Sequence, residues 1–339
     1  DGGAGSRYQA KREIKSFWYP TWLAQPAAMV DGSRVLDAPA DELDVEATLA
    51  IAAGYELVII HTSTPSFPTD AKFAELLKAR APNVLIGMVG AKVAVDPSGS
   101  LQASAAIDFV AREEFDYTCQ DIAYRLPYQD TVGVSYRLAD GRVKHNPPRP
   151  TIEDMDALPF VAPVYQRDLT IANYFIGYLN YPYVSLYTGR GCRSKCTFCL
   201  WPQTVGGHRY RTRSAANVIA EAAWIKARMP EVKELMFDDD TFTDSSNMDR
   251  VHEIAIGLGK LGWIPAFVYI AGAALRLARF NVNIGVVDKR FFQGLPSPAA
   301  AALVTGFIWI MDDAGFHEGV RQIPWLVWTT WVITLFAGL

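Results

Sequence analysis

Cysteine and net charge are both scarce in this chain. Four cysteines among 339 residues are too few for a disulfide scaffold, which excludes the small disulfide-rich secreted proteins. The 32 basic and 36 acidic residues leave a net charge of −4, so the composition predicts no nucleic-acid partner. Disorder is excluded because 50% of the residues are hydrophobic. At this length we expect two or three folded domains.

Charged residues are nearly absent from the last 77 positions, 263–339, which hold five basic and four acidic side chains. Three apolar runs there are each shorter than the roughly 20 residues that cross a bilayer, so buried core helices are the alternative to membrane helices. Tryptophans near the end and basic residues confined to the connections favour membrane helices. The sequence thus predicts an all-α hydrophobic membrane-type segment and the membrane as a partner. The predicted location is the cytoplasmic membrane, with residues 1–262 on the cytoplasmic side.

Short β-branched runs alternate with helix-length segments over residues 1–130. The runs lie at 34–37, 57–61, 84–89 and 107–110. This alternation is typical of βαβ units and predicts an α/β fold, with a Rossmann-like parallel-sheet domain. No strand pattern precedes the opening glycines, so we expect the first strand of that domain to be missing.

Polar and glycine residues follow two of these strands. Ligands of parallel sheets bind at the carboxyl ends of the strands. Thr62 and Ser63 follow the run at 57–61, and Gly90 follows the run at 84–89. We interpret these three as candidate ligand contacts, with plain turn chemistry as the alternative.

A hairpin and a proline-rich linker are expected over residues 131–177, and a second α/β segment over residues 178–262. This segment contains strand patterns at 183–187 and 234–237. Helical patterns follow each of them, at 215–228 after the N-cap residue Ser214 and at about 246–261. The second strand pattern ends in Asp238, Asp239 and Asp240.

Three of the four cysteines are clustered at positions 192, 196 and 199, spaced so that one loop can wrap an inorganic centre. Three soft ligands suit an iron–sulfur cluster or zinc, with His208 as the nearest fourth zinc ligand. A 4Fe-4S cluster on three cysteines leaves one iron open for a substrate or cofactor. Cys119 stands apart and is interpreted as a buried, inert thiol.

The motif Cys192-x-x-x-Cys196-x-x-Cys199, with Phe198 before the last cysteine, resembles the signature of radical S-adenosylmethionine (SAM) enzymes. The resemblance implies that the three cysteines hold a 4Fe-4S cluster whose open iron chelates SAM. An electron from the cluster then cleaves SAM to methionine and a 5'-deoxyadenosyl radical. It also implies SAM contacts at Phe198, Asp238, Asp239 and Asp240, and an electron donor such as flavodoxin or ferredoxin.

The flanking segments Tyr187–Cys192, 200–211 and 237–244 are similar to the hopanoid-biosynthesis-associated radical SAM family, which carries a cobalamin-binding-type N-terminal domain. The resemblance covers residues 1–262. It implies cobalamin as a third cofactor, with Thr62, Ser63 and Gly90 as contacts, and a small-molecule or lipid substrate. Two departures stand out: no Asp-x-His-x-x-Gly motif offers a lower axial ligand, and the radical SAM partial barrel at 178–262 is incomplete.

Residues 263–339 resemble a second family, the C-terminal half of bacterial CDP-diacylglycerol–serine O-phosphatidyltransferase. The resemblance is carried by 274–281 and 289–298, and it implies a lipid head-group or phosphate site at Arg276, Arg279 and Lys289. Positive-inside topology is the alternative reading of these basic residues. The family's metal-binding aspartate motif is absent from the chain.

Three functional hypotheses follow. The first is a radical SAM iron–sulfur protein impaired by its short barrel, the second is a phosphatidyltransferase fragment, and the third is an inactive chimera of the two. The discriminating feature is the cysteine triad, because only the first hypothesis requires a brown, oxygen-sensitive protein.

Overall fold

The computed structural model describes residues 15–177, 179–197, 199–242 and 247–259. The chain divides into two compact units, Asp1–Phe242 and Thr243–Leu339. In the second unit, the described part contains the helix α10 (Met248–Gly257), which buries Val251 and Ile254. The fold and the site described below belong to the first unit.

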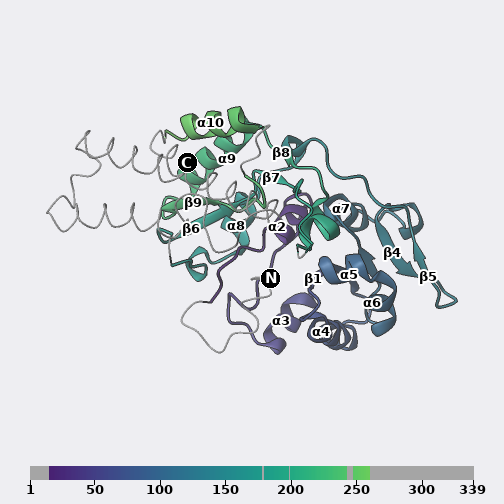
Figure 1. Ribbon diagram of the computed structural model, residues 1–339. Helices are drawn as coiled ribbons and strands as arrows, with labels where there is room; N and C mark the ends of the chain where they lie inside the picture. Colours follow the sequence, from purple (N-terminus) through teal and green to yellow (C-terminus); the bar gives the residue numbers. More distant parts are fainter. Residues whose placement is uncertain (1–14, 178, 198, 243–246, 260–339) are drawn as a thin grey trace, which may run out of the picture. The chain divides into compact units, whose positions relative to one another are not determined.

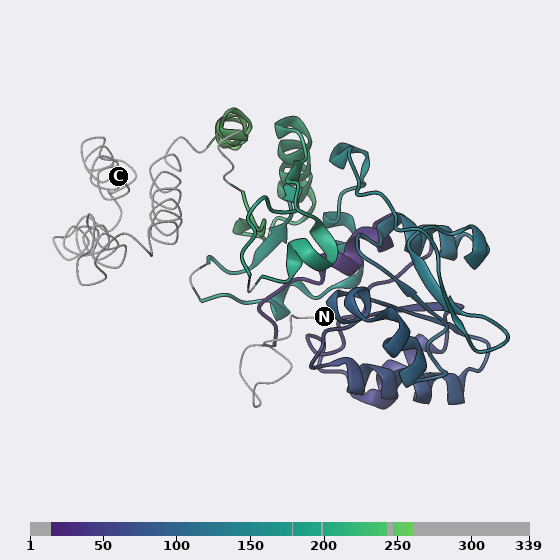
Figure 2. The same cartoon turned by 45° about the vertical axis from the view of Figure 1, so that its right-hand side comes forward.

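A mixed sheet organises the N-terminal part of the first unit. Among the described residues it has five strands in the order β1-β2-β3-β4-β5, of which β1 to β3 are parallel and β4 and β5 form an antiparallel hairpin at one edge (Figure 1 and Figure 2). The α/β class with a parallel sheet is therefore confirmed. The strands are β1 (Leu57–His61), β2 (Leu85–Val89), β3 (Phe109–Ala111), β4 (Val134–Arg137) and β5 (Val143–His145).

Helices before and between these strands bury the faces of the sheet. The Asp44 side chain caps the first of them by accepting a hydrogen bond from Ala47 N at 2.8 Å. Leu77, Ile86 and Met88 are fully buried in the core, where each such side chain contributes about 1.5–3 kcal/mol. The helices are α3 (Val45–Ala52), α4 (Phe67–Arg80), α5 (Ala91–Val95), α6 (Pro97–Ala103), α7 (Asp116–Ala123) and the short η1 (Tyr128–Asp130).

The apolar run at 34–37 does not form a strand. Its Val35 N–H donates to the Asp168 carboxylate at 2.8 Å, so this backbone group is bound by a side chain instead of a neighbouring strand. β1 accordingly forms one edge of the described sheet.

A tyrosine cluster forms the centre of the other core. Tyr19 stacks on Tyr174 with ring centroids 4.1 Å apart, and its hydroxyl donates to the carbonyl of Tyr183 at 2.6 Å. The helix α2 (Thr21–Ala28), just after Tyr19, packs against both α7 and α8, and so joins the two halves of the unit (Figure 1). The remaining elements here are α8 (Ala162–Asp168), η2 (Met155–Ala157) and η3 (Ile171–Asn173).

A second parallel pair follows, as the sequence predicts. β6 (Tyr183–Leu186) pairs in parallel with β9 (Glu234–Phe237), and α9 (Ala215–Arg228) connects them after the Ser214 cap. Between β6 and α9 the chain forms the two-residue strands β7 (Gly189–Arg190) and β8 (Arg211–Thr212), which pair antiparallel, and the π-helical turn η4 (Pro202–Gly206).

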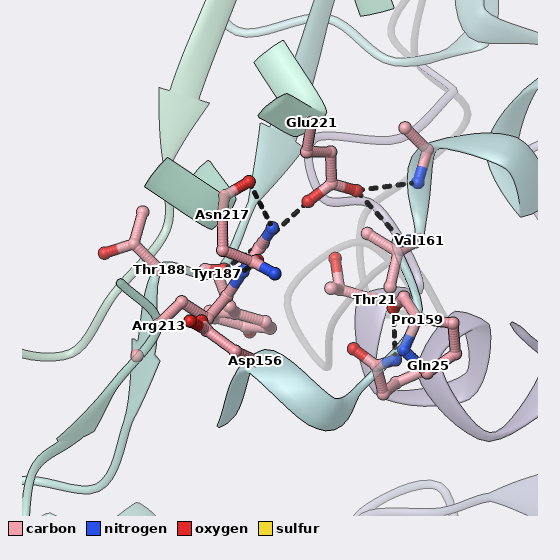
Figure 3. A network of polar contacts seen from close by, with 12 residues as sticks. Thr21, Gln25, Asp156, Pro159, Val161, Tyr187, Thr188, Arg213, Asn217 and Glu221 are labelled. Carbon is pink, nitrogen blue, oxygen red and sulfur yellow. Dashed lines mark hydrogen bonds and ion pairs between the residues drawn. The ribbon is translucent and has the colours of Figure 1, made fainter. Parts of the chain in front are cut away.

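A buried carboxylate fixes α9 against α8 (Figure 3). Glu221 accepts hydrogen bonds from Val161 N at 2.9 Å and Ala162 N at 3.0 Å, at the N-terminus of α8. Its other oxygen pairs with Arg213 at 2.6 Å, and Arg213 also donates to the Tyr187 carbonyl. An anion at a helix N-terminus satisfies free N–H groups and the helix dipole, so this contact orients α8.

The predicted membrane segment and membrane location are wrong. Within the part of the chain that the structure describes, no helix combines the length and the apolar character needed to cross a bilayer. The longest helices there, α4 and α9, have 14 residues each, or about 21 Å, against a hydrocarbon core of about 30 Å. Residues 263–339, on which these predictions rested, lie outside the described residues, as do Arg276, Arg279 and Lys289.

Candidate functional site

The cysteine loop begins directly after β7. Cys192 and Cys199 are half-buried, Cys196 is exposed, and none of the three is in a disulfide. Phe198 lies outside the described residues. The loop starts where Cys192 N donates to the Gly207 carbonyl at 3.2 Å, so the end of η4 holds the first cysteine in place.

Gly191, just before Cys192, is enclosed by backbone. Its φ is +85°, and a Cβ there would lie 2.3 Å from the Arg209 carbonyl oxygen and 2.7 Å from that of Gly206. Only glycine therefore allows β7 to lead into the cysteine loop at this close approach.

Replacing Gly191 with Ala is expected to destabilise the protein by at least about 2 kcal/mol, because left-handed strain adds to a clash with backbone. Gly141→Ala is the matched control, since Gly141 has the same φ of +85° but open space around it. Urea denaturation of both variants measures the difference. Equal losses of stability would show that the close approach is unimportant.

The acidic run after β9 is brought to the same loop. Asp239 accepts hydrogen bonds from Thr188 N at 2.6 Å, from Tyr210 Oη at 3.0 Å and from the Thr188 hydroxyl. Two residues on, the Thr241 hydroxyl donates to Cys192 Sγ at 2.9 Å. Asp239 thus ties the end of β9 to the turn before β7.

Asp238 and Asp240 carry perturbed carboxyl groups. Burial, with repulsion from Asp239 and Asp240, raises the pKa of Asp238 to about 7. Burial also raises the pKa of Asp240. Both raised pKa values mean that the charged form of each carboxyl group is disfavoured at its buried position. A cation bound nearby would favour the charged form and lower these pKa values.

The three candidate cobalamin contacts gather at the carboxyl ends of β1 and β2. Thr62 N donates to the Val89 carbonyl at 2.9 Å, and a Cβ on Gly90 would lie 2.4 Å from the Thr62 carbonyl oxygen. Thr62 and Gly90 are buried, and the Thr62 hydroxyl donates to Asp70 at 2.7 Å. Ser63, half-buried, shares a hydrogen bond with Ser66 at 2.9 Å. Hydrogen bonds therefore fix the conformation of this loop, and Ser63 is the most accessible of the three residues.

This edge of the sheet contacts the segment after the cysteine triad. The helix α5, which starts just after Gly90, packs against η4, which starts three residues after Cys199. Val89 and Val205 belong to the same buried cluster. The candidate cobalamin loop and the cysteine loop thus lie on neighbouring elements.

A buried ionic cluster, which the sequence analysis did not predict, links the start of α7 to the strands β7 and β8. Arg190 Nη1 binds Asp116 at 2.6 Å and Glu114 at 3.0 Å, and Arg211 Nη1 binds Glu114 at 2.7 Å. All four side chains are at most 4% exposed. Arg190 also lies 4.8 Å from the Trp22 ring centre. The Gly-Arg-Gly segment before Cys192 was the one local sign that Arg190 has a structural role. Its acidic partners could not be predicted, because they lie more than 70 residues away in the sequence.

The donor set fits an iron–sulfur cluster better than zinc. Three free thiols lie on one loop, and Thr241, which contacts Cys192, is a hydrogen-bond donor compatible with a thiolate. Among the described residues no three His, Cys, Asp or Glu side chains are arranged to hold a metal ion, and His208 is exposed.

No family model matches the chain. It is 29% identical over 288 residues to an uncharacterised methyltransferase of Pyrococcus horikoshii, covering 82% of this chain and 60% of that protein. It is also 33% identical over 66 residues to the CDP-diacylglycerol–serine O-phosphatidyltransferase of Helicobacter pylori, which is 20% of this chain and 28% of that enzyme. The chain thus spans about 60% of the methyltransferase and a far smaller part of the phosphatidyltransferase.

Solved structures that this chain resembles include cobalamin-dependent radical SAM enzymes. OxsB, with aqua-cobalamin and SAM bound, matches with a TM-score of 0.57 and 15% identity, over 70% of this chain and 34% of OxsB. TsrM from Kitasatospora setae, a radical SAM methyltransferase with tryptophan and a SAM analogue bound, matches with a TM-score of 0.50 and 15% identity, over 79% of this chain and 50% of TsrM. Another TsrM structure contains cobalamin and a [4Fe-4S] cluster. The cofactors of these neighbours match the set that the sequence predicts.

Proposed function

We propose that this chain is the cofactor-binding part of a cobalamin-dependent radical SAM enzyme. The observation that carries the proposal is the contact between Thr241 and Cys192, because it brings the acidic run to the cysteine triad across 49 residues of sequence. An acidic run that reaches a cluster ligand through Thr241 suits binding of SAM at an open iron, because a carboxylate there can accept a hydrogen bond from the amino group of SAM. The fold of OxsB and TsrM supports the same reading.

Each part of the site has a distinct task in this proposal. Cys192, Cys196 and Cys199 hold a 4Fe-4S cluster, which supplies the electron for reductive cleavage of SAM. Asp238 and Asp240 accept hydrogen bonds from the amino group of SAM, and the positive charge of the SAM sulfonium lowers the cost of their buried charges. Asp239 fixes the loop through the turn at Thr188.

The N-terminal sheet supplies the cobalamin site. Ser63 and Gly90 lie at the carboxyl ends of β1 and β2. The helix α5, which starts just after Gly90, packs against η4. Methyl transfer is the reaction class we favour, because the Pyrococcus horikoshii relative and TsrM are both described as methyltransferases. The substrate is a small molecule or lipid, and the resemblance to hopanoid-associated proteins favours a lipid. The electron donor is flavodoxin or ferredoxin.

Anaerobic reconstitution with iron and sulfide tests the proposal. The reconstituted protein should be brown, contain about four iron atoms per chain, and bind SAM. With dithionite it should release 5'-deoxyadenosine and methionine from SAM. A colourless protein without iron would exclude the radical SAM reading.

Asp238→Asn tests the role of the acidic run. In the cluster-loaded wild-type protein we expect SAM affinity to rise with pH through about 7, because only the charged carboxylate attracts the amino group. The variant should bind roughly tenfold more weakly at pH 8 and lose this pH dependence. Equilibrium dialysis with labelled SAM between pH 6 and 8 measures both effects, with the exposed turn variant Asp140→Asn as the control.

The raised pKa of Asp238 also predicts how the stability of the ligand-free protein depends on pH. Folded Asp238 keeps its proton up to about pH 7, whereas the unfolded chain loses it near the ordinary value of 3.8. Its contribution to the free energy of unfolding therefore falls as the pH rises through this window. Asp238→Asn should remove that fall, and an unchanged pH profile would argue against a buried carboxyl group here.

A further inference from the structure

The contact of Thr241 with Cys192 brings the acidic run to the cysteine triad, but SAM binding does not require the Thr241 hydroxyl to touch a sulfur. Its hydroxyl donates to Cys192 Sγ at 2.9 Å, and the contact is half-buried. The acidic run alone accounts for binding of a cationic cofactor. The hydroxyl is directed at a cluster ligand instead.

Separate backbone contacts fix the position of Thr241 and that of Cys192. On the donor side, Asp238 N donates to the Leu186 carbonyl at 2.9 Å, and Asp239 binds the Thr188 backbone at 2.6 Å. On the acceptor side, Cys192 N donates to the Gly207 carbonyl, and Gly191 is enclosed by backbone. The hydroxyl and the sulfur therefore meet because of the fold, without a ligand to bring them together.

A hydrogen bond to a ligand sulfur changes the reduction potential of a cluster. Adding one electron makes the ligand sulfurs more negative, so a donor stabilises the reduced state more than the oxidised state. The effect is strengthened where water is partly excluded, as it is at this half-buried contact.

We propose that Thr241 is a positioning residue that orients Cys192 and raises the reduction potential of the cluster that Cys192 helps to hold. The inference rests on the proposed function, because it needs a cluster at the triad. It adds a residue whose task is to set how readily that cluster accepts an electron.

Thr241→Val tests this with little change in shape. We expect the reconstituted variant to keep its iron and to show a midpoint potential shifted to a more negative value in an anaerobic dithionite titration. Thr241→Ser, which restores the hydroxyl, should return the potential to the wild-type value. Thr204→Val is the matched control, because Thr204 is buried on η4 and its hydroxyl donates to the Leu200 carbonyl at 2.8 Å, not to sulfur.

The outcomes distinguish failure of the role of Thr241 from failure of the proposed function. Equal potentials in wild type, Thr241→Val and Thr241→Ser overturn the role of Thr241 and leave the proposed function standing. A similar shift in Thr204→Val would mean a general loosening of the loop and would also overturn it. Absence of a cluster in the wild-type protein removes the proposed function and this inference together. If Thr241→Val does not fold, Thr241→Ala removes the same hydroxyl and gives the same comparison.

Discussion

Replacing Cys192, Cys196 or Cys199 with Ala is expected to reduce the iron content after anaerobic reconstitution from about four atoms per chain to near background. The reason is that a 4Fe-4S cluster on three thiolates already has one iron without a protein ligand, so loss of another leaves too few bonds to retain it. The described residues offer no substitute group of ligands at this loop. Iron and sulfide analysis, together with the visible absorption of the cluster, measures the loss.

Cys119→Ala is the control for this series. Cys119 is 3% exposed in the cluster of buried residues around β3 and β4, and burial raises the pKa of its thiol well above the ordinary value. A buried neutral thiol is a poor metal ligand, so this variant should keep its full iron content. Retention of iron by all three triad variants would exclude the cysteine loop as the cluster site.

Replacing Glu114 with Ala is expected to lower the free energy of unfolding by about 3–5 kcal/mol. Glu114 binds Arg190 and Arg211, and its carboxylate also accepts a hydrogen bond from Ile152 N at 2.7 Å. Its removal leaves buried positive charge only partly compensated, because within the described ranges a second carboxylate partner, Asp116, is seen for Arg190 and none for Arg211. Urea denaturation measures the change.

Arg80→Ala is the matched comparison. Arg80 pairs with Glu46 at 2.6 Å, but the two side chains are 42% and 76% exposed. Solvent screening makes such a pair worth less than about 1 kcal/mol. If Glu114→Ala costs no more than Arg80→Ala, the buried cluster does not hold the cysteine loop to the N-terminal sheet.

Local sequence patterns predicted most of the secondary structure of the first unit. The β-branched runs at 57–61 and 84–89 and the Ser214 cap fall where β1, β2 and α9 are observed. The run at 34–37 is the exception, because a strand needs a paired neighbour and Asp168 binds Val35 instead. The membrane prediction rested on the composition of residues 263–339, which lie outside the described residues.

The sequence by itself determined the chemistry that this protein can offer. Three cysteines at fixed spacing and an acidic run after a strand offer soft ligands and carboxylates, and these depend only on residue type and local order. The tertiary structure alone decided how they combine. Thr241 reaches Cys192, Asp239 reaches Thr188, and Glu114 reaches Arg190 across 49 to 76 residues of sequence. Such contacts follow from the parallel pairing of β6 with β9 and the packing of α7 against α2, which bring together residues that are far apart in the sequence.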